Sequence, residues 1–307
     1  MLIERTCIVG TGLMGGSLAM ALRPFIPHLT LVDHDPDTRA ACATLADVVT
    51  DTFADGVREA TLVILAVPAR AIVGLLADLP AIRPDGCAVM DIGSTKSDIC
   101  AAMADLPPQF DSIGGHPMCG KEISGFAAAD ADLYRGQTFV LCEHGGTTAV
   151  LQQTAVQLIH HIGANPIHLA PDTHDNLVAA ISHLPYLASA TLMRTAAAME
   201  DERAWTVSAS GFRDTSRIAG SDPQMMLDIL MTNKTAVLTQ LAHFQEMLTA
   251  VTTHLQNDDE AALRDWLTRA QSEHRHYKKL KMGSGSGDQG STGIHPDPQP
   301  PTPDPRL

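Results

Sequence analysis

A glycine pattern near the start of the chain limits what this sequence can fold into. An apolar run at residues 3–9 is followed by G-x-G-x-x-G and then by a stretch of helix-forming residues. In a strand–turn–helix context the glycines allow a tight turn, a close backbone approach to a pyrophosphate and close helix packing. The helix N-terminus then offers N–H groups to the phosphates. A glycine-rich turn without a ligand is the alternative. The cofactor-binding residues predicted from this loop are Gly10, Gly12, Leu13, Met14 and Gly15.

An acidic residue ends the second expected strand and bears on the choice of cofactor. Asp33 follows Gly15 by 18 residues. A carboxylate at this place accepts hydrogen bonds from ribose hydroxyls and repels a 2′-phosphate, so it favours NAD over NADP. A turn or helix-cap role is the alternative, and a cationic His34 would weaken the preference. Val67 and Pro68 end a later strand, either lining the same crevice or simply stopping the strand.

The rest of the chain shows two kinds of pattern. Apolar runs that read as strands alternate with helical segments up to about residue 170, which predicts the α/β class with a doubly wound, Rossmann-type domain at residues 1–170. Residues 171–281 show no convincing strand and predict an all-helical domain, and the Gly/Pro-rich tail at 282–307 is expected to be disordered. The expected strands are 3–9, 28–35, 61–68, 86–93, 110–117 and 137–144. The expected helices are 36–47, 69–79, 96–105, 173–200 with a kink at Pro185, 202–211, 222–254 and 258–280.

Composition excludes several classes of function. The length of 307 residues favours two domains, and a net charge of −14 argues against a nucleic-acid partner, which needs a basic face. We expect no membrane partner because no apolar run is long enough, and no secretory signal because the first strand begins at once. The six cysteines form no C-x-x-C pair, so no metal site is expected, and the protein is expected to be cytoplasmic with reduced thiols.

Two segments at expected strand ends carry candidate chemistry. Two glycines precede His116, which lies at the crevice side of the expected sheet and is well placed as a general base. A hydrogen-bonded structural histidine is the alternative. The segment Asp91–Lys96 joins a strand to a helix, and there Ser94 or Thr95 could act simply as a helix N-cap.

The helical region adds a second group of candidates. Arg213 and Arg217 are spaced i, i+4 and could form an anion site in this acidic chain, or an ordinary surface network with aspartates. His174 and His183 are nine residues apart, which puts them on opposite sides of a regular helix. They can face one site only if the helix is broken between or beside them.

Five segments in order now carry a resemblance. GLMGGSLA, DIGSTK, GGHPMCG, HDNLVAAISHLP and GFRDTSRIA make residues 3–281 similar to the prephenate/arogenate dehydrogenase family. The resemblance implies NAD(P)-dependent oxidative decarboxylation of a small anionic substrate in tyrosine biosynthesis. It also implies a dinucleotide-binding domain followed by a helical domain that forms a homodimer. The apolar face of the last long helices fits that dimer, with Phe244, Met247, Leu248, Val251 and Leu255 on one side.

The resemblance also implies roles for single residues. His116 corresponds to the base that takes the substrate hydroxyl proton, and Ser94 to the serine that hydrogen-bonds this hydroxyl and the histidine. Arg217 corresponds to the arginine that holds a substrate carboxylate, with Arg213 beside it, and His174 and His183 correspond to histidines near the cleft. Together with Tyr186, these four residues are predicted to bind the substrate. Many members read SHLPH where this chain has Tyr186, so prephenate and arogenate both remain open as substrates.

Two further interpretations remain. The first is another dehydrogenase with a Rossmann and a helical domain, of the β-hydroxyacid dehydrogenase or pyrroline-carboxylate reductase type. A catalytic lysine would then rest on Lys234, the only lysine between residues 122 and 277. The second is a non-catalytic NAD-sensing or scaffold protein, which has no need of His116 and Arg217.

Overall fold

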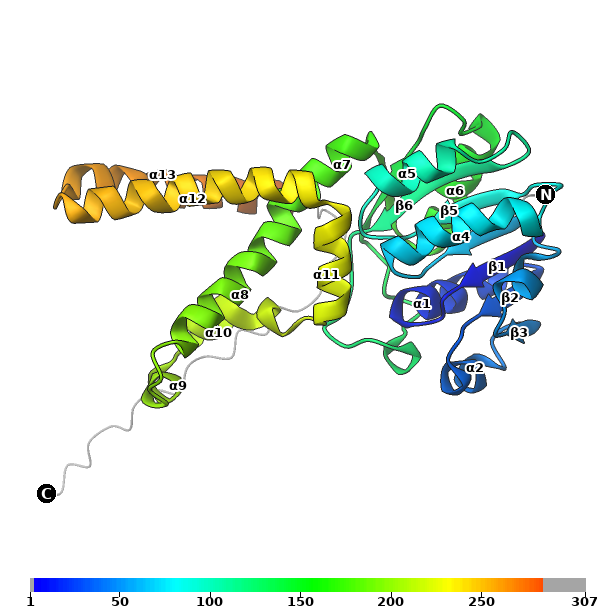
Figure 1. The fold of residues 1–307 in the computed structure, drawn as a ribbon, viewed down its shortest axis with the longest axis horizontal. Coiled ribbons are helices and arrows are strands. Elements are labelled where there is room, and N and C mark those ends of the chain that lie inside the picture. The colour runs from blue at the N-terminus through cyan, green and yellow to red at the C-terminus, as the bar shows by residue number, and fades with distance from the viewer. Residues whose placement is uncertain (1–2, 284–307) are drawn as a thin grey trace, which may run out of the picture. The chain divides into compact units, whose positions relative to one another are not determined.

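The second half of strand β1 (Arg5–Val9) is apolar because both faces of the sheet that it belongs to are covered. Ile8 packs into one hydrophobic cluster, while Cys7 and Val9 pack into a second cluster on the opposite face. Consecutive apolar residues of this kind are typical of a parallel sheet between two helical layers. The computed structural model, shown in Figure 1, describes residues 3–283, and the chain divides between His243 and Phe244 into two compact units.

Eight strands form one sheet in the order β3-β2-β1-β4-β5-β6-β7-β8. The first six are parallel and follow the strand order of the Rossmann fold, so the predicted fold class is confirmed. β7 runs antiparallel to β6, and β8 is parallel to β7. The short strands β3 and β8 were not predicted. The remaining strands are β2 (His28–Val32), β3 (Val48–Thr50), β4 (Leu62–Leu65), β5 (Ala88–Asp91), β6 (Asp111–Pro117), β7 (Thr138–Cys142) and β8 (Asn165–His168).

Helices cover both faces of this sheet. α1 and α6 contribute apolar side chains to the cluster around Ile8, and α3, α4 and α5 contribute to the cluster around Cys7 and Val9. The helix predicted at 36–47 is shorter than expected because Asp47 returns to β2, where its carboxylate accepts from the N–H of Leu29 at 2.8 Å. The helices are α1 (Leu13–Leu22), α2 (Pro36–Cys42), α3 (Phe53–Val57), α4 (Ala69–Ile82), α5 (Ser97–Ala104) and α6 (Ala149–His161).

From Pro171 to the end of the described residues the chain forms helices and no strand. The helix predicted at 173–200 is present as a continuous helical run from α7 through η3 to α8, which ends at Ala197. A π-helical segment, η3, lies just before Pro185, and Pro185 sits in the first turn of α8, where its missing N–H costs little. The elements are α7 (Pro171–Val178), η3 (Ala179–His183), α8 (Leu184–Ala197), α9 (Arg203–Val207), α10 (Ser210–Ser216), the 3₁₀ turn η4 (Arg217–Gly220), α11 (Pro223–Thr232), α12 (Lys234–Gln256) and α13 (Glu260–Gly283).

The ends of the helical region bear on three other expectations. α13 continues to Gly283, so the first two residues of the predicted tail are helical, and residues 284–307 lie outside the described residues. β8 ends at His168 and α7 begins at Pro171, while the domain boundary at residue 170 stays a prediction. No helix in the described part of the chain has both the length and the apolar character needed to cross a bilayer.

The packing at Gly15 predicts a stability difference between two glycines of the same loop. A Cβ at Gly15 would lie 1.9 Å from the carbonyl oxygen of Gly10, whereas a Cβ at Gly12 would meet nothing within 4 Å. We expect Gly15→Ala to lower the free energy of unfolding by about 3 kcal/mol, as overpacking against backbone does. Gly12→Ala is the control and should unfold like the unchanged protein. Equal urea midpoints for the two variants would contradict this packing argument.

Candidate active site

A cleft of about 360 Å³ lies at the carboxyl ends of β1, β4 and β5, where ligands bind in open α/β sheets. The glycine loop forms one side of it, and the segments after β4 and β5 form the floor. The loop after β6 and the first turns of α11 complete the wall. The lining residues include Gly12, Leu13, Met14, Val67, Pro68, Gly93, Ser94, Lys121, Glu122, Ser221, Met225 and Asp228.

The glycine loop has the geometry that a pyrophosphate needs. Gly10 has a φ of 88°, in the left-handed region that favours glycine. Gly12 precedes α1 as its N-cap without any side-chain hydrogen bond, so the first N–H groups of the helix remain available on the open side of Gly12. Free N–H groups and the positive end of a helix attract an anion. The residues present therefore fit a dinucleotide.

Asp33 supports the glycine loop from the end of β2. Its Oδ2 accepts from the backbone N–H of Thr11 at 2.7 Å and from the Thr11 hydroxyl at 2.9 Å. Its Oδ1 accepts from the N–H of Asp35 at 3.0 Å. The side chain is still 10% exposed. The carboxylate is thus fixed beside the glycine loop by these three hydrogen bonds.

The strand carrying His116 passes unusually close to the end of β5. The N–H of Gly115 donates to Asp91 Oδ1 at 3.1 Å, and a Cβ at Gly115 would lie 2.5 Å from the Asp91 carbonyl oxygen. A glycine before the histidine is therefore required by contact between the strands. The consequence is that partly buried His116 is held at the C-terminal end of β6, next to the β5–α5 segment that contributes Ser94 to the cleft.

A buried ion pair lies under this strand end. The Lys96 ammonium contacts Asp91 Oδ2, and both side chains are fully buried. Asp91 Oδ2 also accepts from the N–H of Gly93 at 2.7 Å. Burial raises the pKa of Asp91, and the Lys96 charge opposes that rise. Removing one member of such a pair leaves an uncompensated charge, which is strongly destabilising, so the pair fixes the local backbone.

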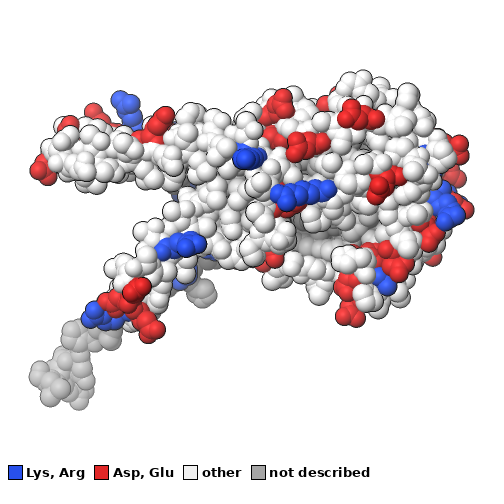
Figure 2. All heavy atoms as spheres, in the orientation of Figure 1, with Lys and Arg blue, Asp and Glu red and all other residues white. Residues whose placement is uncertain are grey.

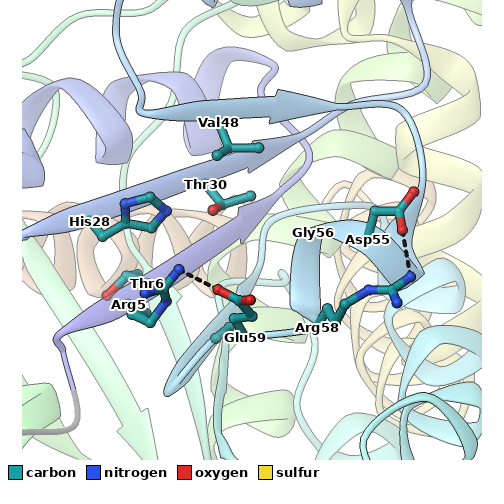
Figure 3. Close-up of a pocket in the computed structure, with 10 residues that line it drawn as sticks. Arg5, Thr6, His28, Thr30, Val48, Asp55, Gly56, Arg58 and Glu59 are labelled. Carbon is teal, nitrogen blue, oxygen red and sulfur yellow. Dashed lines mark hydrogen bonds and ion pairs between the residues drawn. The ribbon is translucent and has the colours of Figure 1, made fainter.

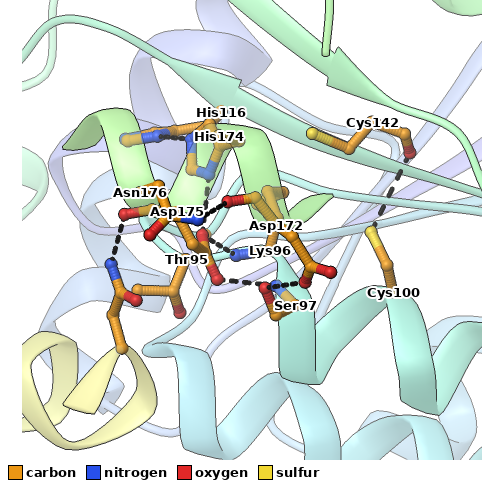
Figure 4. Close-up of polar contacts among 12 residues, drawn as sticks. Thr95, Lys96, Ser97, Cys100, His116, Cys142, Asp172, His174, Asp175 and Asn176 are labelled. Atoms are coloured by element: carbon orange, nitrogen blue, oxygen red, sulfur yellow. Dashed lines mark hydrogen bonds and ion pairs between the residues drawn. The ribbon is translucent and has the colours of Figure 1, made fainter. Parts of the chain in front are cut away.

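His116 is also the end of a chain of three side chains, drawn in Figure 4. Its Nδ1 lies 2.7 Å from His174 Nε2, and His174 Nδ1 lies 2.8 Å from Asp175 Oδ1. Asp175 accepts the N–H groups of Lys96 and Ser97, each at 2.8 Å, and so caps the start of α5. His174 and Asp175 are buried. Helix α7 is thereby tied to the Rossmann domain directly beneath His116.

The surroundings keep the candidate base neutral. Burial lowers the pKa of His116 well below its ordinary value of 6.5, and the neighbouring His174, Lys96 and His183 lower it further. Burial acts to raise the pKa of Asp175, but the hydrogen bonds from His174, Ser97 and Lys96 outweigh it and lower that pKa. A neutral imidazole beside an ionised carboxylate is the state that a general base needs near neutral pH.

The other predicted helical-domain residues are placed differently from one another. His183 is buried, and its Nδ1 lies 3.3 Å from Asn233 Nδ2, while burial lowers its pKa to about 4. His174 is equally buried, so the π-helical segment lets both rings turn inward although they are nine residues apart. Tyr186 is partly exposed on α8, and its hydroxyl makes no hydrogen bond to any described residue.

The two arginines contact separate acidic partners. Arg217 forms an ion pair with Glu122, and Glu122 is one of the residues that line the cleft. Arg213 is exposed and lies 3.4 Å from its neighbour Asp214. α10 ends at Ser216, so Arg217 already belongs to the following 3₁₀ turn. The structure therefore shows no shared contact of the two guanidinium groups.

Three residues of the site were missed at the sequence level. Asp91, Lys96 and Asp175 stand inside segments that the sequence singled out, but no role was predicted for them. Neither Ser94 nor Thr95 caps α5; the Thr95 hydroxyl instead donates to Thr232 at 2.9 Å, and Asp175 provides the cap. One signal was available in the sequence: Asp91 stands near the end of an apolar strand segment, Lys96 follows that segment, and Asp175 stands in a helical segment. A charged residue that becomes buried in such a segment needs a partner.

Two other cavities among the described residues differ from this site in their lining. A cavity of about 210 Å³, shown in Figure 3, lies between the N-terminal halves of β1 and β2 and helix α3, where Arg5 pairs with Glu59 and Arg58 with Asp55. Its charges are already matched. Lys234 is exposed and lines a separate cavity, so it is not placed as a base in the cleft. Across residues 3–283 no group of three or more ligating side chains is arranged to hold a metal ion.

Two family models match consecutive parts of this chain. The model of the prephenate dehydrogenase nucleotide-binding domain matches residues 18–168, and that of the prephenate dehydrogenase dimerization domain matches residues 170–269. The prephenate dehydrogenase of Bacillus subtilis is 31% identical over 262 residues, which is 82% of this chain and 70% of that protein.

Two solved structures are similar over nearly their whole length. The prephenate dehydrogenase of Aquifex aeolicus, in complex with hydroxyphenyl propionate and NAD⁺, is 26% identical with a TM-score of 0.82, covering 89% of this chain and 98% of that one. The arogenate dehydrogenase of Synechocystis is 28% identical with a TM-score of 0.76, covering 89% of this chain and all of the other. The glycine loop, the histidine at the end of β6 and these similarities agree: the chain belongs to the prephenate dehydrogenase family.

Proposed function

We propose that this protein catalyses the NAD-dependent oxidative decarboxylation of prephenate to 4-hydroxyphenylpyruvate, a step of tyrosine biosynthesis. The observation that carries the proposal is His116, a neutral histidine held at the end of β6 by the buried chain through His174 to Asp175. It stands next to the segment that brings Ser94 into the dinucleotide cleft. Membership in the prephenate dehydrogenase family supports the same reaction.

The cofactor is NAD. The open side of Gly12 and the uncapped start of α1 would hold its pyrophosphate, and Asp33 would accept from its adenosine ribose. When bound, NAD⁺ supplies the hydride acceptor. Val67 and Pro68 line the same cleft and would contact the dinucleotide. The NAD⁺ complex of the Aquifex aeolicus relative supports this assignment.

The residues of this chain would divide the remaining work. His116 takes the proton of the substrate hydroxyl as the C4–H bond breaks, and Ser94 is placed in the cleft to hydrogen-bond that hydroxyl. Arg217 would bind a substrate carboxylate in exchange for Glu122, with Arg213 farther out. Acidic groups are spread over the face shown in Figure 2, so an anionic substrate depends on such local positive charge.

Arogenate is the second candidate substrate. It differs from prephenate in carrying an amine on the side chain instead of a keto group. Tyr186 occupies the position where many family members have a histidine, and a tyrosine has no positive charge near neutral pH to repel an ammonium group. The arogenate dehydrogenase of Synechocystis, which is similar over its full length, supports keeping this alternative.

We also propose that the protein is a homodimer. Met247, Leu248 and Leu255 on the second compact unit are each half or more exposed, and the matching family model is that of a dimerization domain. Apolar side chains gathered on one helical face are typical of an interface. Light scattering is expected to give twice the chain mass of 32.7 kDa. A chain-sized particle at micromolar concentration would contradict the dimer.

The catalytic proposal predicts turnover that depends on His116. Reduction of NAD⁺, followed at 340 nm with prephenate and with arogenate separately, should occur with at least one of them. His116→Asn should bind NAD⁺ unchanged but lose about 10²–10⁴-fold in kcat. Because the lowered pKa keeps His116 neutral, the acidic fall of kcat/KM should lie below pH 6.5. NAD⁺ binding without turnover of either substrate would overturn the proposal in favour of a sensor or another dehydrogenase.

The position of Asp33 predicts the cofactor preference. Asp33→Asn removes the negative charge that would face a 2′-phosphate, so the ratio of kcat/KM for NADP⁺ to that for NAD⁺ should rise about tenfold or more, which corresponds to about 1.4 kcal/mol. Asp37→Asn, the same charge change in the first turn of α2, is the matched control and should alter the ratio little. An unchanged ratio in Asp33→Asn would show that another residue reads the ribose.

A further inference from the structure

The three side chains of His116, His174 and Asp175 form a chain whose hydrogen-bond directions can be assigned from its contacts. Asp175 Oδ1 accepts from the backbone N–H of Lys96, and Oδ2 accepts from the N–H of Ser97. Its pKa is lowered, so the carboxylate is ionised and can only accept hydrogen bonds. His174 Nδ1, 2.8 Å from Oδ1, must therefore carry a proton.

The proton on His174 Nδ1 also determines which nitrogen of His116 is protonated. With one proton per ring, His174 presents a lone pair at Nε2, so His116 must donate from Nδ1 across the 2.7 Å contact. His116 Nε2 is then left without a proton. The opposite arrangement would place two acceptors, His174 Nδ1 and Asp175 Oδ1, against each other at 2.8 Å inside the protein. Such an unpaired contact between buried acceptors is costly.

We propose that His174 and Asp175 are positioning residues for the reaction: they form with His116 an Asp–His–His chain that locks His116 in the Nδ1–H tautomer and shares the positive charge while His116 holds the substrate proton. The part of the inference that concerns the substrate proton rests on the proposed function. The part that concerns the tautomer rests on the hydrogen bonds alone. It gives His174 a role through His116 in place of the substrate contact predicted from the sequence, because the buried His174 ring already uses both nitrogens.

The proton balance explains why such a chain is useful. The hydroxyl O–H bond breaks and its proton goes to His116 Nε2, while a hydride leaves C4 for the bound dinucleotide and the O–H electron pair forms the C4 carbonyl. When the ring carboxylate leaves as CO₂, its bonding pair aromatises the ring and leaves a phenolate. The phenolate takes the proton back from His116, so no net proton is released.

The charges around His116 show where the transient cation is stabilised. Lys96 and Asp91 form a neutral pair, and His183 carries no charge above a pH of about 4. Asp175 is the charge left over, and it is connected to His116 only through the His174 ring. The chain therefore has a net charge of −1 at rest and becomes neutral when His116 is protonated. The His174 Nδ1–H bond to Asp175 strengthens as that charge develops.

The first test reads the tautomer and needs no turnover. In protein labelled with ¹⁵N-histidine, long-range ¹H–¹⁵N spectra distinguish Nδ1–H from Nε2–H rings, and His116→Asn identifies the His116 signals. We expect the Nδ1–H form for His116 and His174 in the unchanged protein. An Nε2–H ring at His116 would overturn the proposal. This measurement also separates its failure from that of the proposed function, which would show as absent turnover.

The second test uses chemical rescue of His174→Ala. We expect kcat to fall about 10²-fold, with the dissociation constant of NAD⁺ unchanged. Added imidazole should restore kcat in a saturable way, and substituted imidazoles should restore it to degrees that follow their pKa. The control is His168→Ala, which removes a histidine bound to the carboxylate of Glu143 on the far strand β8 and should leave activity and imidazole response unchanged.

The outcomes separate a positioning role from a merely structural one. Rescue that depends on the pKa of the added base supports the chain. Equal rescue by pyrrole, which fills the same space but is not basic, would show that His174 only fills a hole. Unchanged kcat in His174→Ala would also overturn the proposal. If His174→Ala does not fold, His174→Gln keeps the test open, because its amide fills part of the space and cannot accept the proton.

Discussion

The carboxylate of Asp175 is the contact on which the site depends. It accepts three hydrogen bonds, two from the backbone at the start of α5 and one from His174. The same residue receives a hydrogen bond on its carbonyl oxygen from Asn233 at 2.7 Å. One buried acidic residue thus joins the Rossmann domain, helix α7 and the start of α12. Its desolvation is offset because both carboxylate oxygens accept hydrogen bonds.

A second buried carboxylate organises the strand side of the site. Asp91 accepts from Gly93, Gly115 and the Lys96 ammonium, and this brings β6 against the end of β5. Lys96 belongs to both networks, since its side chain pairs with Asp91 while its backbone N–H donates to Asp175. The position of His116 is therefore fixed by two networks, one centred on Asp175 and the other on Asp91. A shift in either network would move the candidate base.

Sequence patterns predicted those parts of the fold that depend on residues close together in the chain. The glycine loop, its flanking strand and helix and the all-helical second half followed from apolar runs and periodicity. Local patterns did not predict the antiparallel direction of β7, the edge strands β3 and β8 or the π-helical segment. These features depend on partners distant in the chain. The same holds for the site: His116 was marked by its neighbouring glycines, whereas Asp175 lies 78 residues from Ser97 and no local signal joins them.

Burial of the ring and the carboxylate of Asp175 together explain how one site can keep a histidine neutral and still let it accept a proton. Asp91 is balanced by Lys96, while burial of the ring, with smaller effects from His174, Lys96 and His183, holds the pKa of His116 low at rest. Among the described residues Asp175 forms no ion pair with a lysine or arginine, so its negative charge can stabilise a protonated His116 through the His174 ring. A histidine that is already protonated cannot remove a proton. A neutral histidine without a nearby carboxylate would become a buried cation with no compensating negative charge. Burial thus keeps the ring neutral at rest, and Asp175 stabilises the cation once it forms, so a single ring meets both requirements.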